Sequence, residues 1–215
     1  MVSEDPLSPL PAPRRSSAAA KLLFDLLLAG AGLVVLAPVM VAIAVCIRLD
    51  SPGPVFFRQQ RVGRHGALFR IHKFRTMAHA PSGLGLPLTV GADARVTRAG
   101  RWLRRTRLDE LPQLIDVLAG SMSLVGPRPE VPRYVALYPP ALRDKVLSVR
   151  PGITDPASLL NLDESEVLGR AADPEQAYVE EVLPAKLRCS ALYVDQRSLI
   201  GDLRLLGRTL KVIFR

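Results

Sequence analysis

The sequence predicts a mostly helical α/β protein with two parts. One is an N-terminal re-entrant membrane element of the helix–break–helix type. The other is a compact cytosolic domain with a short β-hairpin and surface amphipathic helices. Residues 22–47 form one apolar run with basic residues on both sides. Residues 55–60 and 67–74 are rich in aromatic and β-branched residues. Much of the later sequence shows apolar residues at helical spacing.

The composition indicates a basic protein at a membrane. The 215-residue chain has a formal net charge of +9 and a positive mean hydropathy of +0.19. Basic nucleic-acid-binding proteins are usually hydrophilic, and aromatic residues, at 5%, are too few to predict base-stacking platforms. We therefore expect membrane lipids as partners and no nucleic acid. Cys46 and Cys189 lack the spacing of a disulfide framework or a zinc site.

The N-terminal region divides into a tail and a membrane element. Residues 1–17 are expected to form a disordered, Pro-rich tail, because they contain four prolines and no apolar periodicity. The apolar run that follows is about 26 residues long, too long for a signal-peptide core and long enough to cross a membrane. We expect the membrane element over residues 18–48 and the cytosolic domain over residues 49–215.

Pro38 and the flanking charges bear on the topology of this element. Pro38 removes a helical hydrogen bond and clashes with the preceding turn, so the helix is expected to break or kink there. Basic residues lie before the run, as at Lys21, and after it, as at Arg48, whereas a single-pass helix normally has one basic flank. A re-entrant hairpin that returns both ends to the cytosolic face satisfies both facts. A kinked single-pass helix is the alternative, since spanning helices tolerate proline.

The cytosolic domain is predicted to begin with strands and continue with helices. Residues 55–60 and 67–74 are expected to pair as a hairpin, followed by a Gly/Pro-rich loop at residues 81–91. Helices are expected at residues 130–137, 141–149, 163–169, 175–183, 185–195 and 202–214. The last one alternates basic and apolar residues, as do helices on a membrane surface, although a peripheral core helix would look similar.

An adjacent acid pair, Asp109-Glu110, lies in a run of cations. Apolar residues after the pair recur at helical spacing, and Pro112 is tolerated only in the first turn of a helix. The helix is therefore predicted to begin near Leu108 or Asp109, with Asp109 as its N-cap and Gly120 just past its end. Helix N-termini favour anions. On its own, however, the pair is more often an ordinary acidic cap beside a solvated basic face.

Further motifs change this interpretation, because they occur with the acid pair in one order along the chain. They are an apolar segment containing Pro38, then Lys73-Phe74-Arg75-Thr76-Met77, then Asp109-Glu110, then Met122-Ser123-Leu124-Val125-Gly126-Pro127-Arg128-Pro129, then Arg150-Pro151-Gly152-Ile153-Thr154. Together they resemble the bacterial sugar transferase family, the small monotopic phosphoglycosyl transferases, from about residue 21 to residue 214. The order and spacing are specific, whereas no single motif is.

The resemblance implies an enzyme at the cytosolic face of the bacterial inner membrane. In this family an Asp attacks the β-phosphate of a UDP-sugar, releases UMP and passes the sugar phosphate to a polyprenyl phosphate, here expected to be undecaprenyl phosphate. This is the first membrane step of polysaccharide or glycoconjugate assembly, as in exopolysaccharide biosynthesis. Mg²⁺ is the expected cofactor, because it relieves the repulsion between a carboxylate and a diphosphate. The resemblance is compatible with a homodimer. It also favours the re-entrant hairpin over a single-pass helix for the membrane element.

Carried onto this sequence, the resemblance makes Asp109 the nucleophile. Glu110 would assist it as a metal ligand or a proton acceptor, and both carboxylates are candidate Mg²⁺ ligands. The candidate phosphate-binding residues are Lys73, Arg75, Arg104 and Arg128. Arg128 lies between two prolines, where its guanidinium is expected on a stiff turn.

The sequence departs from the family pattern after Thr154. Many members continue there with Gly-Trp-Ala-Gln-Val-Asn-Gly, whereas this chain has a different stretch at residues 155–161, so the sugar is left open. Two other classes of function are alternatives. A membrane-tethered nucleic-acid-binding module would bind with a steep salt dependence but does not explain the acid pair. A non-enzymatic adaptor would use its basic surface to bind lipid head groups.

Overall fold

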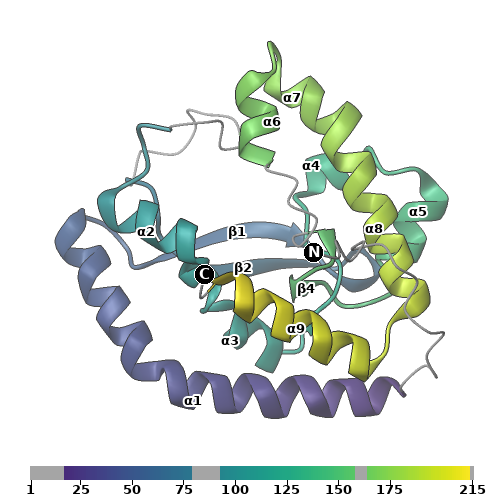
Figure 1. The fold of residues 1–215 in the computed structure, drawn as a ribbon, viewed down its shortest axis with the longest axis horizontal. Coiled ribbons are helices and arrows are strands. Elements are labelled where there is room, and N and C mark those ends of the chain that lie inside the picture. Colours follow the sequence, from purple (N-terminus) through teal and green to yellow (C-terminus); the bar gives the residue numbers. More distant parts are fainter. Residues whose placement is uncertain (1–16, 79–92, 158–163, 214–215) are drawn as a thin grey trace, which may run out of the picture.

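The computed structural model describes residues 17–78, 93–157 and 164–213 and shows a mostly helical protein with two small sheets (Figure 1). Its helices and strands are α1 (Ala18–Asp50), β1 (Phe56–Val62), β2 (Leu68–Phe74), α2 (Arg98–Thr106), α3 (Gln113–Leu118), β3 (Ser123–Val125), α4 (Pro132–Val135), α5 (Pro140–Val146), β4 (Gly152–Thr154), α6 (Glu164–Arg170), α7 (Pro174–Ala177), α8 (Leu183–Gln196) and α9 (Leu199–Ile213). Short 3₁₀ turns lie at Arg64–Gly66 and Leu108–Glu110, and a π-helical turn at Tyr178–Val182. The predicted tail, apart from Ser17, and the predicted loop at residues 81–91 lie outside the described residues.

Strands β1 and β2 form the predicted antiparallel hairpin. They pair in register from Phe56 opposite Phe74 to Val62 opposite Leu68. Because side chains alternate along a strand, Phe57 and its partner Lys73 lie on one face of the hairpin. Phe56 lies on the other face, where its ring stacks on Phe74 with centroids 5.6 Å apart.

A second, parallel pair of strands, β3 and β4, was not predicted. Ser123 lies opposite Gly152, and Val125 lies opposite Thr154. The backbones approach closely just past β3, where a Cβ added at Gly152 would lie 2.1 Å from the nitrogen of Gly126. Each strand has three residues, which is too short for an alternating pattern to be visible in the sequence.

Helix α1 follows the lower edge of the molecule in Figure 1 and bends upward at the left. The helix is continuous over 33 residues and contains Pro38, whose missing N–H gives the physical reason for a bend. The predicted break is therefore a bend within one helix, not an interruption. By length and composition α1 could cross a membrane, and only 11% of its apolar window is buried, unlike the core helix of a soluble protein.

A buried ion-pair network holds the N-terminal half of α1 against β3 and α9. Lys21 Nζ lies 2.9 Å from Asp25 Oδ1 and 2.8 Å from Asp202 Oδ2. Ser123 donates a hydrogen bond of 2.8 Å to Asp25, and the hydroxyl of Tyr193 donates one of 2.9 Å to Asp202. Burial raises the pKa of Asp202, and Lys21 opposes this shift.

The C-terminal end of α1 is fastened to both β2 and α2. The guanidinium of Arg75, which directly follows β2, donates to the carbonyl oxygens of Ile47 (3.3 Å), Ser51 (2.6 Å) and Pro52 (2.7 Å). Asp50 accepts a hydrogen bond of 3.0 Å from the nitrogen of Ala99 in the first turn of α2. The hairpin and α2 are thus fixed to the end of the apolar helix.

Among the described residues, the core consists of three hydrophobic clusters. One surrounds Tyr134, Tyr178 and Leu187 beside α8. Another joins α1 to α3 and β3, and the third joins the C-terminal half of α1 to β2 and α2. Each of the six predicted downstream helices has a counterpart between α4 and α9, although the one at residues 175–183 is divided into α7 and the π-helical turn. Helix α2 was not predicted.

Gly100 tests the packing of α2 against the chain after β2. A Cβ added at Gly100 would lie 2.0 Å from the carbonyl oxygen of Thr76, so Gly100→Ala should displace α2. We expect a loss of about 1–3 kcal/mol, as at other overpacked sites. Gly207→Ala in α9 is the control, because no atom lies within 4 Å of its added Cβ and Ala favours helix. Thermal unfolding in one detergent compares the two variants, and equal melting temperatures would contradict this packing.

Candidate active site

The acid pair lies in a 3₁₀ turn between α2 and α3. Arg107 ends α2 in the left-handed conformation, with φ 55°, and the turn covers Leu108–Glu110. Helix α3 begins at Gln113, so the prediction that Asp109 is a helix N-cap is wrong. Pro112 explains the shift, because a residue without an N–H suits the position before the helix. Gly120 follows the helix with φ +76°, as predicted.

Glu110 is buried and paired with cations from two other segments. Lys73 Nζ of β2 lies 2.7 Å from Glu110 Oε1. The guanidinium of Arg128 donates to both carboxylate oxygens of Glu110, with Nη1 3.4 Å from Oε2. Burial opposes the charge of Glu110, but Arg128 and Lys73 outweigh it and hold the pKa of Glu110 well below its ordinary value. Glu110 is therefore ionised at neutral pH.

Asp109 is also buried but is held more loosely. Lys73 Nζ lies 3.9 Å from its Oδ2, farther than from Glu110. Burial raises the pKa of Asp109; Lys73 and Arg128 act against this shift and the charge of Glu110 adds to it. Two neighbouring carboxylates thus have opposite pKa shifts, and such pairs mark acid, base or nucleophile sites.

Arg104 extends the cationic side of the site. Its Nε donates a hydrogen bond of 2.9 Å to Thr76 Oγ1, which directs the guanidinium from α2 towards the chain after β2. Burial lowers the pKa of Arg104, and the charge of Asp109 raises it, so the two groups interact. Lys73, Arg104 and Arg128 thus give three cations around two carboxylates.

Arg75 has different partners from the other predicted phosphate ligands. Its guanidinium is occupied by the hydrogen bonds to the end of α1, and it also bonds Ser51 Oγ at 2.9 Å. The structure therefore brings Lys73, Arg104 and Arg128 to the acid pair and gives Arg75 a structural role. A role of Arg75 in phosphate binding stays a prediction.

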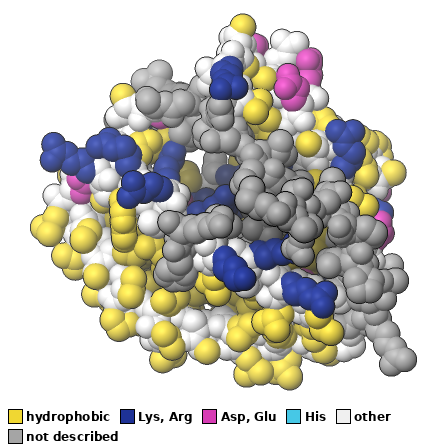
Figure 2. Space-filling view, in the orientation of Figure 1, with side chains coloured by type: hydrophobic (Ala, Val, Ile, Leu, Met, Phe, Trp, Pro, Cys, Tyr) yellow, Lys and Arg dark blue, Asp and Glu magenta, His cyan; other side chains and the backbone are white. Residues whose placement is uncertain are grey.

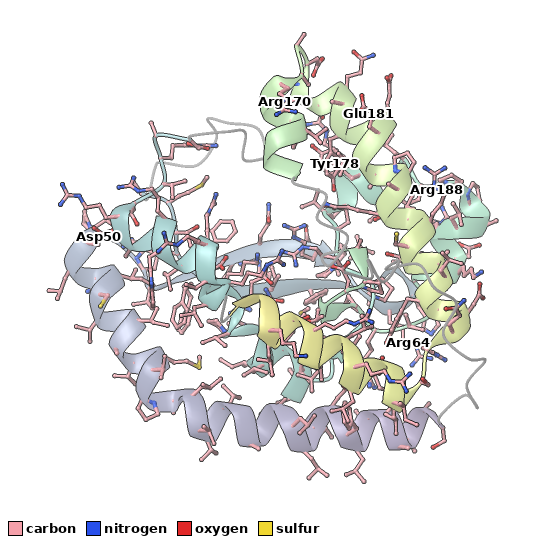
Figure 3. All side chains as sticks on the ribbon, in the orientation of Figure 1. Asp50, Arg64, Arg170, Tyr178, Glu181 and Arg188 are labelled. Carbon is pink, nitrogen blue, oxygen red and sulfur yellow. The ribbon has the colours of Figure 1, made fainter. Side chains whose placement is uncertain are left out.

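A group that the sequence analysis missed supports the turn that carries Arg128. Arg61 Nη1 donates to the carbonyl oxygen of Pro129 at 3.1 Å and to Glu130 Oε1 at 3.2 Å. The hydroxyl of Tyr178 donates to Glu130 Oε2 at 2.5 Å, and Figure 3 shows Tyr178 on the upper part of the molecule, below α6 and α7. These contacts join segments far apart in the sequence, so no local sequence pattern predicts them.

The side chains that could coordinate a metal ion at the acid pair limit the kind of metal that fits there. Within residues 17–78, 93–157 and 164–213, no cluster of three or more His, Cys, Asp or Glu residues could hold a metal ion. Mg²⁺ does not need such a cluster, because it is commonly bound by one or two carboxylates, substrate phosphates and water. Asp109 and Glu110 therefore suit Mg²⁺ that arrives with a phosphate-bearing substrate.

Comparisons with known proteins confirm the family resemblance. A family model described as bacterial sugar transferase matches residues 16–215. A UDP-glucose:undecaprenyl-phosphate glucose-1-phosphate transferase of Caulobacter vibrioides is 36% identical over 210 residues, or 93% of this chain and 71% of that protein. The exopolysaccharide production protein PSS of Rhizobium leguminosarum is 36% identical over 192 residues, or 86% of this chain and 90% of that protein.

Other relatives are longer than this chain. A UDP-N-acetylgalactosamine-undecaprenyl-phosphate N-acetylgalactosaminephosphotransferase of Aeromonas hydrophila is 37% identical over 191 residues, or 88% of this chain but 42% of that protein. The chain likewise spans 28% of a UDP-glucose:undecaprenyl-phosphate glucose-1-phosphate transferase of Xanthomonas campestris, with 46% identity over 138 residues.

The opposite pKa shifts of the acid pair predict opposite effects on stability. The raised pKa of Asp109 means that its ionised form destabilises the fold above that pKa, so Asp109→Asn should raise the melting temperature at pH 7. This gain should shrink as the pH falls and Asp109 itself becomes neutral. Glu110→Gln should instead cost about 1.5–3 kcal/mol at pH 7, because it removes the carboxylate that pairs with Lys73 and Arg128, two partly buried cations.

Thermal unfolding of both variants between pH 3 and pH 8 measures these effects. The loss in Glu110→Gln should stay constant down to about the ordinary pKa of Glu and diminish at lower pH, since the stabilisation from a lowered pKa is complete above the ordinary value and is lost as the pH falls towards the lowered one. Stabilisation by Glu110→Gln, or destabilisation by Asp109→Asn at pH 7, would refute these assignments.

Proposed function

Because the chain belongs to the bacterial sugar transferase family, we propose that it is a phosphoglycosyl transferase that moves a sugar 1-phosphate from a UDP-sugar to undecaprenyl phosphate and releases UMP. The observation that carries this proposal is the environment of Asp109. It is a buried carboxylate with a raised pKa, next to a tightly paired Glu110 and surrounded by Lys73, Arg104 and Arg128. The printed names of relatives, which act on UDP-sugars and undecaprenyl phosphate, support the substrate class.

The proposed reaction has two steps, and Asp109 serves in both. Its ionised oxygen attacks the β-phosphorus of the UDP-sugar; a P–O bond forms, and the bond to the bridging oxygen breaks with its electrons leaving on UMP. A phosphate oxygen of undecaprenyl phosphate then attacks the same phosphorus and restores the Asp109 carboxylate. Lys73, Arg104 and Arg128 offset the negative charge of the two phosphate-bearing substrates.

Mg²⁺ fits this proposal as a partner of the diphosphate. Asp109 and Glu110 would hold it together with phosphate oxygens. When bound, it would lower the repulsion between the carboxylates and the diphosphate. Glu110 also orients Lys73 and Arg128, because it contacts both cations.

The exposed surface supports attachment to the inner membrane at its cytosolic face. Apolar side chains line the lower edge of the molecule in Figure 2, where α1 runs, and basic side chains gather at the left. In α2, Arg98, Arg101, Trp102 and Arg105 are exposed on one side, while Leu103 is buried on the other. Tryptophan and arginine beside an apolar helix suit the head-group region of an anionic leaflet. We place the chain in polysaccharide or glycoconjugate assembly, in line with its exopolysaccharide-production relative.

A donor-only reaction tests the covalent step. With UDP-sugar and Mg²⁺ but no lipid, the enzyme should release at most one UMP per active site. Intact-mass and peptide analysis should find phosphosugar on the Asp109 peptide, and undecaprenyl phosphate should remove it. Asp109→Asn should abolish the adduct and turnover while remaining folded.

Asp144→Asn provides the matched control, since Asp144 is an exposed carboxylate on α5. This variant should form the adduct as the wild type does. Transfer by Asp109→Asn, or rapid transfer without any adduct that can be trapped, would exclude Asp109 as the nucleophile.

Cysteine labelling tests the re-entrant topology. After Cys46 and Cys189 are replaced by Ser, single cysteines at Ala18 and Pro54 place one probe at each end of α1. If both ends face the cytosol, a membrane-impermeant maleimide should label neither site in intact spheroplasts and both after permeabilisation. Labelling of one site in intact spheroplasts would instead show a single-pass helix. Pro38→Ala should shift some molecules towards that form, because the apolar length permits it.

A further inference from the structure

Phe57 is a large, exposed apolar side chain beside Lys73, the cation that reaches the acid pair. It is 47% exposed, although it pairs directly with Lys73 across the hairpin. Side chains of opposed residues in an antiparallel pair lie on the same face, with Cβ atoms about 5 Å apart. Lys73 in turn reaches Glu110 at 2.7 Å and Asp109 at 3.9 Å. Phe57 therefore borders the place where the reacting phosphates would lie.

The end of the hairpin that carries Phe57 is fixed to the C-terminal end of helix α1. The nitrogen of Arg75 donates a hydrogen bond of 2.9 Å to the carbonyl oxygen of Val55, and its guanidinium binds the end of α1. Phe57 is two residues beyond Val55, about 7 Å along the strand. The last turns of α1 expose Val45 (52%) and Leu49 (83%). Exposed apolar side chains thus lie at the end of the membrane helix and again beside Lys73.

We propose that Phe57 contacts the first isoprene units of the polyprenyl acceptor and so holds the acceptor phosphate next to Lys73 and Asp109. This inference rests on the proposed function. The acceptor has an apolar tail that starts directly at its phosphate, so a side chain that grips the tail must lie next to the phosphate site. Phe57 is apolar, adjacent to that site and close to the end of α1, along which a membrane lipid would arrive. The donor nucleotide is polar and does not require an apolar contact on the membrane side.

The two half-reactions separate this role from a general loss of activity. Phe57→Ala should form the Asp109 adduct and release UMP as the wild type does when no acceptor is present. In the full reaction its KM for acceptor should rise at least about 10-fold, as expected for loss of a buried aromatic contact, with kcat nearly unchanged. Farnesyl phosphate in detergent micelles should show the same rise, because the contact involves the first isoprene units. Phe57→Leu should restore most of the affinity.

Phe56→Ala is the matched control. Phe56 is the neighbouring residue, has the same side chain and a similar exposure of 41%, and lies on the opposite face of the hairpin. Leu68→Ala adds an exposed apolar position at the far end of the hairpin, opposite Val62. Neither variant should change the KM for acceptor. Melting temperatures of all variants show whether the hairpin is intact, and Phe57→Thr, which favours a strand but lacks the large apolar side chain, replaces Phe57→Ala if the latter unfolds.

Each outcome discriminates between specific alternatives. An unchanged KM for acceptor in Phe57→Ala, or a rise equal to that in Phe56→Ala, would refute the contact. A higher KM for UDP-sugar with a normal KM for acceptor would place the donor base on Phe57 and overturn the inference. If wild-type enzyme neither releases UMP without acceptor nor makes lipid-linked product, the proposed function itself fails.

Discussion

The paired charges around Glu110 organise this structure. One buried carboxylate contacts Lys73 from β2 and Arg128 from the turn after β3, so three segments distant in sequence meet at it. Removing these groups from water costs free energy, which is offset only while all of them are present. The arrangement also leaves the neighbouring Asp109 in a buried site where the closest cation, Lys73, is already engaged by Glu110. The strong pairing of one carboxylate thus leaves the other available for chemistry.

The apolar helix α1 is connected to this group through a few polar contacts. Arg75 binds the end of α1 and directly follows β2, the strand that carries Lys73. At the other end of α1, Asp25 accepts a hydrogen bond from Ser123 in β3, the strand that precedes Arg128. Both cations that pair with Glu110 therefore lie on segments fastened to α1. The apolar helix and the site form one structural unit, which suits the proposed transfer to a lipid acceptor.

The sequence predicted those parts of the fold that depend on local patterns. Aromatic and β-branched residues predicted the two strands of the hairpin, and a glycine after an apolar period predicted the end of α3 at Gly120. The N-cap prediction for Asp109 failed because Pro112 is also compatible with a helix that starts after it. The direction of Arg75 and the partners of Asp25 depend on tertiary contacts that sequence spacing does not encode. For the acid pair, the sequence indicated which residues to consider, whereas the opposite directions of their pKa shifts follow from burial and from the positions of Arg128 and Lys73.

The segment in which this chain departs from the family pattern is electrostatically linked to the site. Asp155, its first residue, is 2% exposed and directly follows β4, which pairs with β3 ahead of Arg128. The pKa of Arg128 is raised mainly by Glu110, and the charges of Asp155 and Asp109 add to this effect. A change at Asp155 therefore alters the field at a predicted phosphate ligand without any change in the acid pair. Asp155 is thus coupled to Arg128, and through Arg128 to the acid pair.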